Sequence, residues 1–321
     1  MLCSNIPQSK VYKFYFRFTV KTEFMMTEEW THEVYDQHIY KGIIFSGNFS
    51  RNNIERCSNL RLYDDDVVIY TYMRSGTTLT QHIVWGLCDN DVDCNASIED
   101  MLDRYIFMEN QRILARPNDP PDLDKVIPNG KRKLYKTHLP LNMLPKDLIN
   151  GTSHPKLIIV IRNPFDVAVS CYNFYRDFKY NNCYSGTWDE FFDKAFIGGN
   201  ILYGRWFDWM KGLAESDLIT THSPLILSYE DFLFDLEGQV ERIANFLNVP
   251  IDETKMIKIR KLCDIKRQKS TTTEIMRPFI RNGETRKWNV KFTNAQVLTL
   301  QKEMEKLPSR LHDYSIISFS Q

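Results

Sequence analysis

Two residues that can carry proton and charge chemistry stand close together in the run Lys136-Thr137-His138-Leu139-Pro140. Alternate residues of a strand point to the same side, so a strand ending here would direct Lys136 and His138 toward the carboxyl edge of a sheet. A neutral histidine accepts a proton near neutral pH, and a lysine neutralises charge that develops on a transferring group. A purely structural histidine explains the pattern equally well.

The stretch Tyr72-Met73-Arg74-Ser75-Gly76-Thr77-Thr78 holds the parts of a phosphate cradle. The first N–H groups of a helix lack backbone partners and, with the helix dipole, attract anions. Gly76 would let the backbone approach an anion closely, and Arg74 adds a fixed positive charge. Hydroxyl donors come from Ser75, Thr77 and Thr78. The Gly-Lys step of a Walker loop is missing, which counts against an ATP- or GTP-hydrolysing enzyme. A tight turn with ordinary capping hydroxyls remains the alternative.

Two further basic segments could bind an anion. Arg162 ends the most apolar run of the chain, and Ser170 follows eight residues later. An arginine guanidinium is planar and binds a phosphate through two hydrogen bonds. The late loop Arg277-Pro278-Phe279-Ile280-Arg281-Asn282-Gly283 combines two arginines with a glycine and could wrap an anion. A surface ion pair at Arg162 and a simply solvated late loop are the plainer alternatives.

These residues follow apolar runs that predict strands. The four runs are Val67–Tyr72, Lys133–Lys136, Leu157–Ile161 and Leu225–Tyr229. Helical spacing of apolar residues follows the first run, a helix should start near Phe165, and Leu236–Leu247 is amphipathic. Strands that alternate with helices predict an α/β fold with a central parallel sheet covered on both faces. No shift in composition divides the chain, so one main domain is expected.

The overall composition excludes several classes of protein. The 321 residues carry 41 basic and 41 acidic side chains, so the net charge indicates neither a nucleic acid nor a membrane as a partner. The seven cysteines form no C-x-x-C pair, which favours reduced thiols and a cytoplasmic location. No run of about 20 apolar residues could span a bilayer. Acidic residues show no metal-ligand spacing, and residues 1–35 form an extension of uncertain order.

Taken in order, these motifs resemble the cytosolic sulfotransferase family from about Tyr40 to Lys306. The family's first signature reads roughly Y-P-K-S-G-T-T-W and is similar to Tyr72–Leu79. Its K-T-H-L-P matches Lys136–Pro140 at every position, and its R-N-x-x-D-V-A-V-S is similar to Arg162–Ser170. A Y-E-D element resembles Tyr229–Asp231, and F-x-R-K-G resembles the end of the late loop.

The resemblance implies a three-layer α/β/α fold, with a strand–loop–helix phosphosulfate-binding loop, over residues 36–321. It implies 3′-phosphoadenosine 5′-phosphosulfate (PAPS) as sulfuryl donor and 3′-phosphoadenosine 5′-phosphate as product, with no metal. His138 would take the proton from a hydroxyl or amine of a small acceptor, apolar or phenolic. Lys136 and Arg74 would stabilise the sulfuryl oxygens and the leaving phosphate. In-line transfer of this kind depends on positioning and positive charge.

The resemblance also implies where the nucleotide binds. The first loop would hold the 5′-phosphosulfate, and Arg162, Ser170 and Arg281 would hold the 3′-phosphate. The full set of implied nucleotide contacts is Arg74, Ser75, Gly76, Thr77, Thr78, Leu79, Arg162, Ser170, Tyr229, Thr271, Arg281, Asn282 and Gly283.

The chain departs from the family at several of these positions. Arg74 replaces a lysine and cannot donate a proton near neutral pH, so it can only stabilise a leaving group by its charge. Leu79 replaces a tryptophan that would stack on adenine, and Thr273 lies where a second aromatic is expected. Asn282 replaces a lysine near the 3′-phosphate. Two hypotheses follow. The first is an active sulfotransferase with weakened or altered recognition of its nucleotide donor. The second is a non-catalytic nucleotide- or ligand-binding protein with the same fold.

The family's dimer motif, K-x-x-x-T-V-x-x-x-E, would fall on Asn289–Leu298. Only Thr293 is retained there, since Asn294 and Leu298 replace the valine and the glutamate. The sequence therefore leaves open a monomer or a homodimer.

Overall fold

The structure is a computed structural model in which residues 37–47, 49–110, 122–177, 184–274, 276–280 and 287–314 are described. Every described residue belongs to one compact unit, Glu33–Gln321. The N-terminal extension predicted over residues 1–35 lies outside the described residues.

Five parallel strands form the central sheet, in the order β4-β5-β3-β6-β7. Their bounds are β3 (Val67–Thr71), β4 (Ile106–Phe107), β5 (Leu134–Thr137), β6 (Lys156–Ile161) and β7 (Leu225–Ser228). The four predicted strands are confirmed, each to within one residue at either end. Strand β4 was not predicted, because two residues are too few to show a strand period. Since all five strands run parallel, their carboxyl ends meet at one edge of the sheet.

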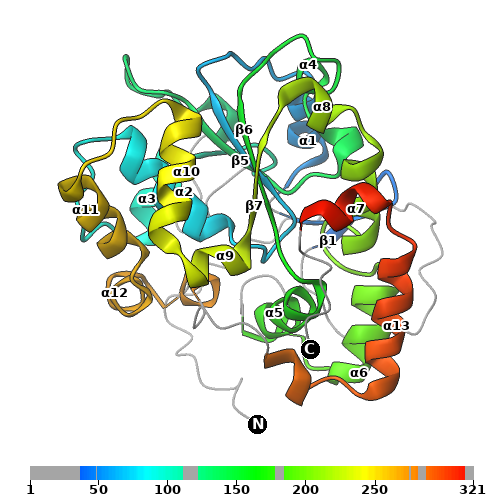
Figure 1. Ribbon diagram of the computed structural model, residues 1–321. Coiled ribbons are helices and arrows are strands. Elements are labelled where there is room, and N and C mark those ends of the chain that lie inside the picture. The colour runs from blue at the N-terminus through cyan, green and yellow to red at the C-terminus, as the bar shows by residue number, and fades with distance from the viewer. Residues whose placement is uncertain are drawn as a thin grey trace, which may run out of the picture. The chain divides into compact units, whose positions relative to one another are not determined.

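Helices on one face of the sheet share its main hydrophobic core (Figure 1). They are α2 (Thr77–Cys88), α3 (Ile98–Arg104), α10 (Leu236–Leu247), α11 (Glu253–Cys263) and α12 (Ile265–Thr271). Val67 and Ile69 of β3 point to this face and pack in the same core as Ile243 and Ile259. Gly86 lets α11 come close to α2, because a Cβ there would lie 2.8 Å from Ile259.

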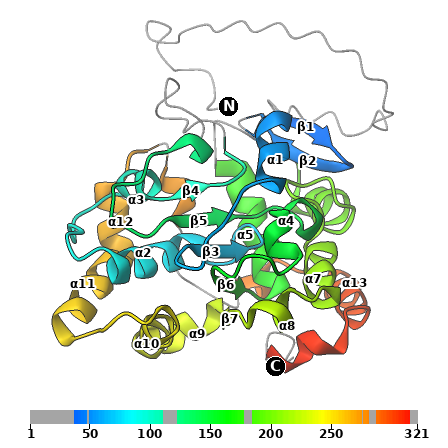
Figure 2. The same ribbon diagram turned by 90° about the horizontal axis from the view of Figure 1, so that it is seen from above.

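Helices on the opposite face complete the third layer (Figure 2). They include α7 (Trp206–Glu215), α8 (Leu218–His222) and α13 (Asn294–Glu305). Tyr70 of β3 points to this side, and its ring centroid lies 4.5 Å from that of Trp209 on α7. The alternation along β3 explains why the strand is apolar throughout: both faces are covered. The predicted three-layer α/β/α fold with a parallel sheet is confirmed.

Shorter elements complete the described part of the chain. The strands β1 (Gln37–Tyr40) and β2 (Ile43–Ser46) form an antiparallel hairpin. The remaining helices are α1 (Arg51–Ser58), α4 (Lys146–Ile149), α5 (Pro164–Asp177), α6 (Trp188–Glu190) and α9 (Tyr229–Phe234), with a π-helix at Phe191–Ile197. The 3₁₀ turns are Asp122–Asp124, Leu141–Met143, Arg277–Phe279, Lys287–Val290 and Ser309–Tyr314. Among the described residues, no helix has the length and apolar character needed to cross a bilayer.

Candidate active site

The carboxyl edge of the sheet collects the polar residues singled out above. The 72–76 loop follows β3, His138 follows β5, Arg162 follows β6 and Tyr229 follows β7. Glu109, which the sequence did not indicate, lies just beyond β4. Residues that are far apart in the sequence therefore share one edge of the sheet, as ligand-binding residues of parallel α/β sheets commonly do.

The 72–76 loop turns sharply into the N-terminus of α2. The backbone φ is +65° at Arg74 and +105° at Gly76, both in the left-handed region. Gly76 is the N-cap of α2 and supplies no side-chain capping bond. The Ser75 hydroxyl is buried and has no hydrogen-bond partner among the described residues. A buried polar group without a partner costs about 1–3 kcal/mol. These features fit an anionic ligand better than an ordinary capped turn.

The aromatic ring of Tyr229 packs directly against Gly76. A Cβ at this position would lie 2.6 Å from Cδ2 of Tyr229, closer than any real contact. The sequence predicted that Gly76 frees space for an anion; in the structure its lack of a side chain makes room for Tyr229. The guanidinium of Arg162 lies over the Tyr229 ring in a cation–π contact, with its Cζ 4.2 Å from the ring centroid. Glycine, tyrosine and arginine thus form one stack across three strand ends.

His138 is buried and its ring is oriented by β3. Its Nδ1 lies 2.8 Å from the carbonyl oxygen of Thr71 and 3.1 Å from the Thr71 hydroxyl. Because a carbonyl can only accept, Nδ1 carries the proton and Nε2 holds the free lone pair. Burial, with the nearby charges of Lys136 and Arg74, lowers the pKa of His138 to about 3. The imidazole is therefore neutral at physiological pH, in the tautomer whose Nε2 can accept a proton.

Lys136 lies near His138 but is almost withdrawn from solvent. Its Nζ sits 4.0 Å from the centroid of the Phe107 ring, in a cation–π contact. Burial lowers the pKa of Lys136 to about 8, and the largest opposing influence is the charge of Glu109. Lys136 and His138 both contact the Phe107 ring, so the structure brings these two predicted residues together at the end of β5.

Arg74, in the 72–76 loop, bonds to Ser170, and Arg162 bonds to the backbone of Arg74. Arg74 donates from Nε to Ser170 Oγ at 3.2 Å and from Nη2 to the Pro278 carbonyl at 3.3 Å. Its guanidinium also lies 4.9 Å from the centroid of the Phe174 ring. Arg162 donates from Nη1 to the carbonyl of Arg74 at 3.0 Å. The structure therefore brings together three of the residues predicted to hold the nucleotide.

The remaining predicted residues are placed as follows. The Thr77 hydroxyl lies 2.7 Å from that of Thr71, and the Thr78 carbonyl bonds to the ring of His82. Leu79 is half-buried and packs against the hydrophobic core. Thr271 is exposed at the end of α12, where its hydroxyl donates to the Arg267 carbonyl of its own helix. Predicted residues Arg281, Asn282 and Gly283 lie outside the described residues.

Sequence reasoning missed three residues that support His138. Thr71 orients the ring, and Tyr203 packs against it edge-on with ring centroids 5.2 Å apart. Glu109 accepts hydrogen bonds from the backbone of His138 and from the hydroxyl of Thr137. Thr71 lies inside the predicted strand Val67–Tyr72, one residue before its predicted end, where its hydroxyl could have drawn attention. Glu109 and Tyr203 lie in segments without a recognisable period, so no sequence signal marked them.

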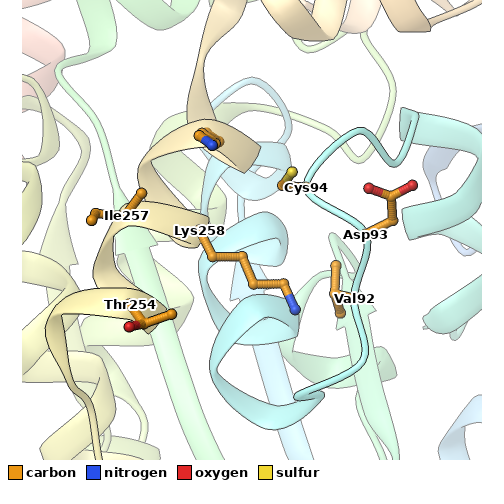
Figure 3. Close-up of a pocket in the computed structure, with 7 residues that line it drawn as sticks. Val92, Asp93, Cys94, Thr254, Ile257 and Lys258 are labelled. Carbon is orange, nitrogen blue, oxygen red and sulfur yellow. The ribbon is translucent and has the colours of Figure 1, made fainter.

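A separate groove lies away from these residues, between α11 and the segment before α3 (Figure 3). Its volume is about 390 Å³, and its lining residues are Val92, Asp93, Cys94, Thr254, Ile257, Lys258 and Lys261. Lys258 reaches across it and donates to the carbonyl of Asn90 at 2.8 Å. No residue predicted to bind the nucleotide lines this groove. Within the described ranges, no group of three His, Cys, Asp or Glu residues could hold a metal ion.

The fold and the site together define an α/β protein in which a neutral histidine, a buried lysine and two arginines lie at the carboxyl edge of a parallel sheet. Residues 64–314 match the sulfotransferase domain. The chain belongs to the sulfotransferase family, and the predicted family is thereby confirmed.

Individual relatives agree with this assignment. Sulfotransferase 1C2 of Rattus norvegicus is 32% identical over 259 residues, which cover 76% of this chain and 83% of the relative. The crystal structure of mouse sulfotransferase SULT7A1 complexed with PAP superposes with a TM-score of 0.67 at 23% identity, covering 84% of this chain and 94% of that one. Retinol dehydratase in complex with androsterone and PAP gives 0.67 at 24% identity, with coverage of 85% and 88%.

Proposed function

We propose that this protein transfers the sulfuryl group of PAPS to a hydroxyl or amine of a small acceptor. The observation that carries the proposal is the hydrogen bond from His138 Nδ1 to the Thr71 carbonyl. It leaves Nε2 unprotonated, as a general base requires, and the lowered pKa keeps the ring neutral. Bound PAPS would supply the activated sulfuryl group.

The nucleotide would bind along the carboxyl edge of the sheet. The 72–76 loop and the first N–H groups of α2 would hold the 5′-phosphate, with the Ser75 hydroxyl gaining the partner that it lacks among the described residues. Arg162 and Ser170 would hold the 3′-phosphate. Lys136 would stabilise charge on the transferring group, since a cation in a buried site acts strongly on nearby charge. No metal takes part in this scheme.

The acceptor would be apolar or phenolic, because aromatic rings surround His138. The Phe107 and Tyr203 rings lie edge-on to it at centroid distances of 5.6 and 5.2 Å, and Phe49 contacts both of them. Retinol dehydratase, a structural neighbour, binds androsterone, a small and largely apolar molecule that would suit such an aromatic pocket. We further propose a cytoplasmic location, which suits the free thiols of Cys57, Cys88, Cys94 and Cys263.

The test combines transfer and binding in one variant. With PAPS and a panel of phenols, steroids and amines, we expect His138→Ala to lower kcat by about 10²–10⁴-fold, the usual contribution of a general base. Calorimetry should show nearly unchanged affinity for 3′-phosphoadenosine 5′-phosphate, because the hydrogen bonds of His138 within the described residues go to Thr71 and Glu109, neither of which is assigned to the phosphates. Loss of nucleotide binding in this variant would mean that the role of His138 is misassigned. Folded wild-type protein without turnover on any acceptor would refute the proposed reaction.

The alternative function is a nucleotide- or ligand-binding protein without transfer. It is favoured by Leu79, which packs against the core where the family has a stacking tryptophan, and by Arg74, which contacts Ser170. Micromolar binding of the nucleotide without turnover would support this alternative. Absence of nucleotide binding would contradict both functions.

A further inference from the structure

Glu109 is a fully buried carboxylate directly behind the strand end that carries His138. Its Oε1 accepts from the backbone N–H of His138 at 2.8 Å, and its Oε2 accepts from the Thr137 hydroxyl at 2.9 Å. The Thr137 hydroxyl in turn accepts from the N–H of Leu139 at 3.1 Å. A single side chain therefore fixes the backbone on both sides of the His138 Cα, where β5 ends.

The backbone next to this carboxylate pairs with Lys136: the Met108 N–H donates to the Lys136 carbonyl at 3.1 Å, and the Lys136 ammonium lies over the Phe107 ring. Among the charges around Lys136, Glu109 has the largest effect in favour of its charged form, and Asp122 comes next. Lys125, which lies near Asp122, opposes it. An ammonium that is withdrawn from water needs such a partner, because burial disfavours the charged form.

We propose that Glu109 is a positioning residue: it holds the Thr137–His138 turn in place and keeps Lys136 charged inside the protein. The inference rests on the proposed function, since it assigns Glu109 to the support of the proposed base and cation. Glu109 itself does not contact the transferring group in this scheme. Removing its charge should therefore alter Lys136 and the rate of transfer rather than nucleotide binding.

Other titratable groups also face Glu109. Burial raises the pKa of Tyr203, from the segment before α7, and the charge of Glu109 adds to this effect. Burial likewise raises the pKa of Cys57 of α1 and of Tyr70 of β3, and the charge of Glu109 raises both further. All three are neutral at physiological pH. Among these neighbours, Lys136 is therefore the one whose charge stabilises the ionised form of Glu109. Burial raises the pKa of Glu109 to about 7, against the stabilising bonds from His138 and Thr137.

The experiment follows the charge of Lys136 directly. Protein labelled with ¹³C at lysine Cε is titrated by NMR, and the Lys136 signal is assigned by its loss in Lys136→Met. The wild-type signal should titrate with a midpoint near 8. In Glu109→Gln, which keeps the shape of the side chain, the midpoint should fall by about one to three pH units, the effect of removing a close opposite charge. An unchanged midpoint would overturn the proposal.

Two variants separate the roles of Glu109. Thr137→Val removes both hydrogen bonds of the Thr137 hydroxyl, to Glu109 and from Leu139, but leaves the charge of Glu109, so the Lys136 midpoint should stay near 8 while kcat falls. Asp122→Asn is the matched control: a buried carboxylate near Lys136 that bonds to Phe107 and Asn110 instead of the His138 turn. A midpoint shift in Asp122→Asn as large as that in Glu109→Gln would refute a special role for Glu109.

Kinetics provides the second readout. In Glu109→Gln the alkaline limb of the kcat profile should move to lower pH by the same amount as the NMR midpoint, with little change in KM for the nucleotide. Matching shifts support the proposal, and a kcat profile that ignores the NMR shift contradicts it. Since the NMR titration needs no turnover, failure of the proposed reaction would be seen separately, as an inactive wild type with an intact titration.

Discussion

Replacing Gly76 by alanine tests the stack of Gly76, Tyr229 and Arg162. Alanine at φ +105° is strained, which costs about 1–2 kcal/mol. Its Cβ would also lie 2.6 Å from the Tyr229 ring, so the ring must move. A forced rearrangement of this kind adds about 1–3 kcal/mol. We therefore expect Gly76→Ala to lower the free energy of unfolding by about 2–5 kcal/mol in total.

The matched control is Gly130→Ala. Gly130 also has a positive φ, +80°, but a Cβ there meets no atom within 4 Å. It should cost only the backbone strain, about 1–2 kcal/mol. Urea denaturation of both variants isolates the steric contribution of Tyr229 as their difference. The double variant Gly76→Ala/Tyr229→Ala should recover at least about 1 kcal/mol relative to the sum of the single changes.

Nucleotide binding supplies an independent check. A displaced Tyr229 would carry Arg162 with it, because the guanidinium lies on its ring. The affinity of Gly76→Ala for 3′-phosphoadenosine 5′-phosphate, measured by calorimetry, should therefore fall about tenfold or more. Equal destabilisation by Gly76→Ala and Gly130→Ala, with no coupling to Tyr229, would refute the stacked arrangement.

Two further predictions concern α2. Burial lowers the pKa of His82 to about 4 from an unfolded value of 6.5, so the folded protein binds fewer protons and loses stability as pH falls from 6.5 to 4. His82→Gln should remove about 3 kcal/mol of this acid sensitivity in urea titrations, and an unchanged loss of stability between pH 6.5 and 4 in this variant would contradict the assignment. Leu79→Trp should tighten nucleotide binding about fivefold by restoring an aromatic surface for stacking, and unchanged affinity in calorimetry would show that the side chain at this position faces only the core.

The sheet could be predicted because its strands are buried on both faces. A run such as Val67–Thr71 is apolar at nearly every position, and that signal needs no partner to be recognised. The short strand β4 gave no such signal, and neither did the β1–β2 hairpin, where only Phe45 and Ser46 are buried. Strands that are short or half-exposed depend on tertiary packing, which a single sequence does not reveal.

The site could be predicted only where a motif carried it. Lys136 and His138 were found because they flank a strand end, and Arg162 because it closes the strongest strand. The tautomer of His138 depends on Thr71, which is 67 residues away in the chain. Tyr203 and Glu109 act through space on that same ring and turn. These contacts form only when distant segments meet in the folded protein, so residue type and spacing alone cannot predict them.

The contacts of Arg74 bear on how the protein is made. The five-stranded sheet is complete once β7 has been synthesised, at Ser228. Arg74, however, bonds to the Pro278 carbonyl, which is 204 residues further along the chain. A nascent chain that has emerged only as far as α10 can pair all five strands of the sheet while the turn after β3 still lacks one of its anchors. Competence to bind the nucleotide should therefore arise late in translation, after the sheet has formed.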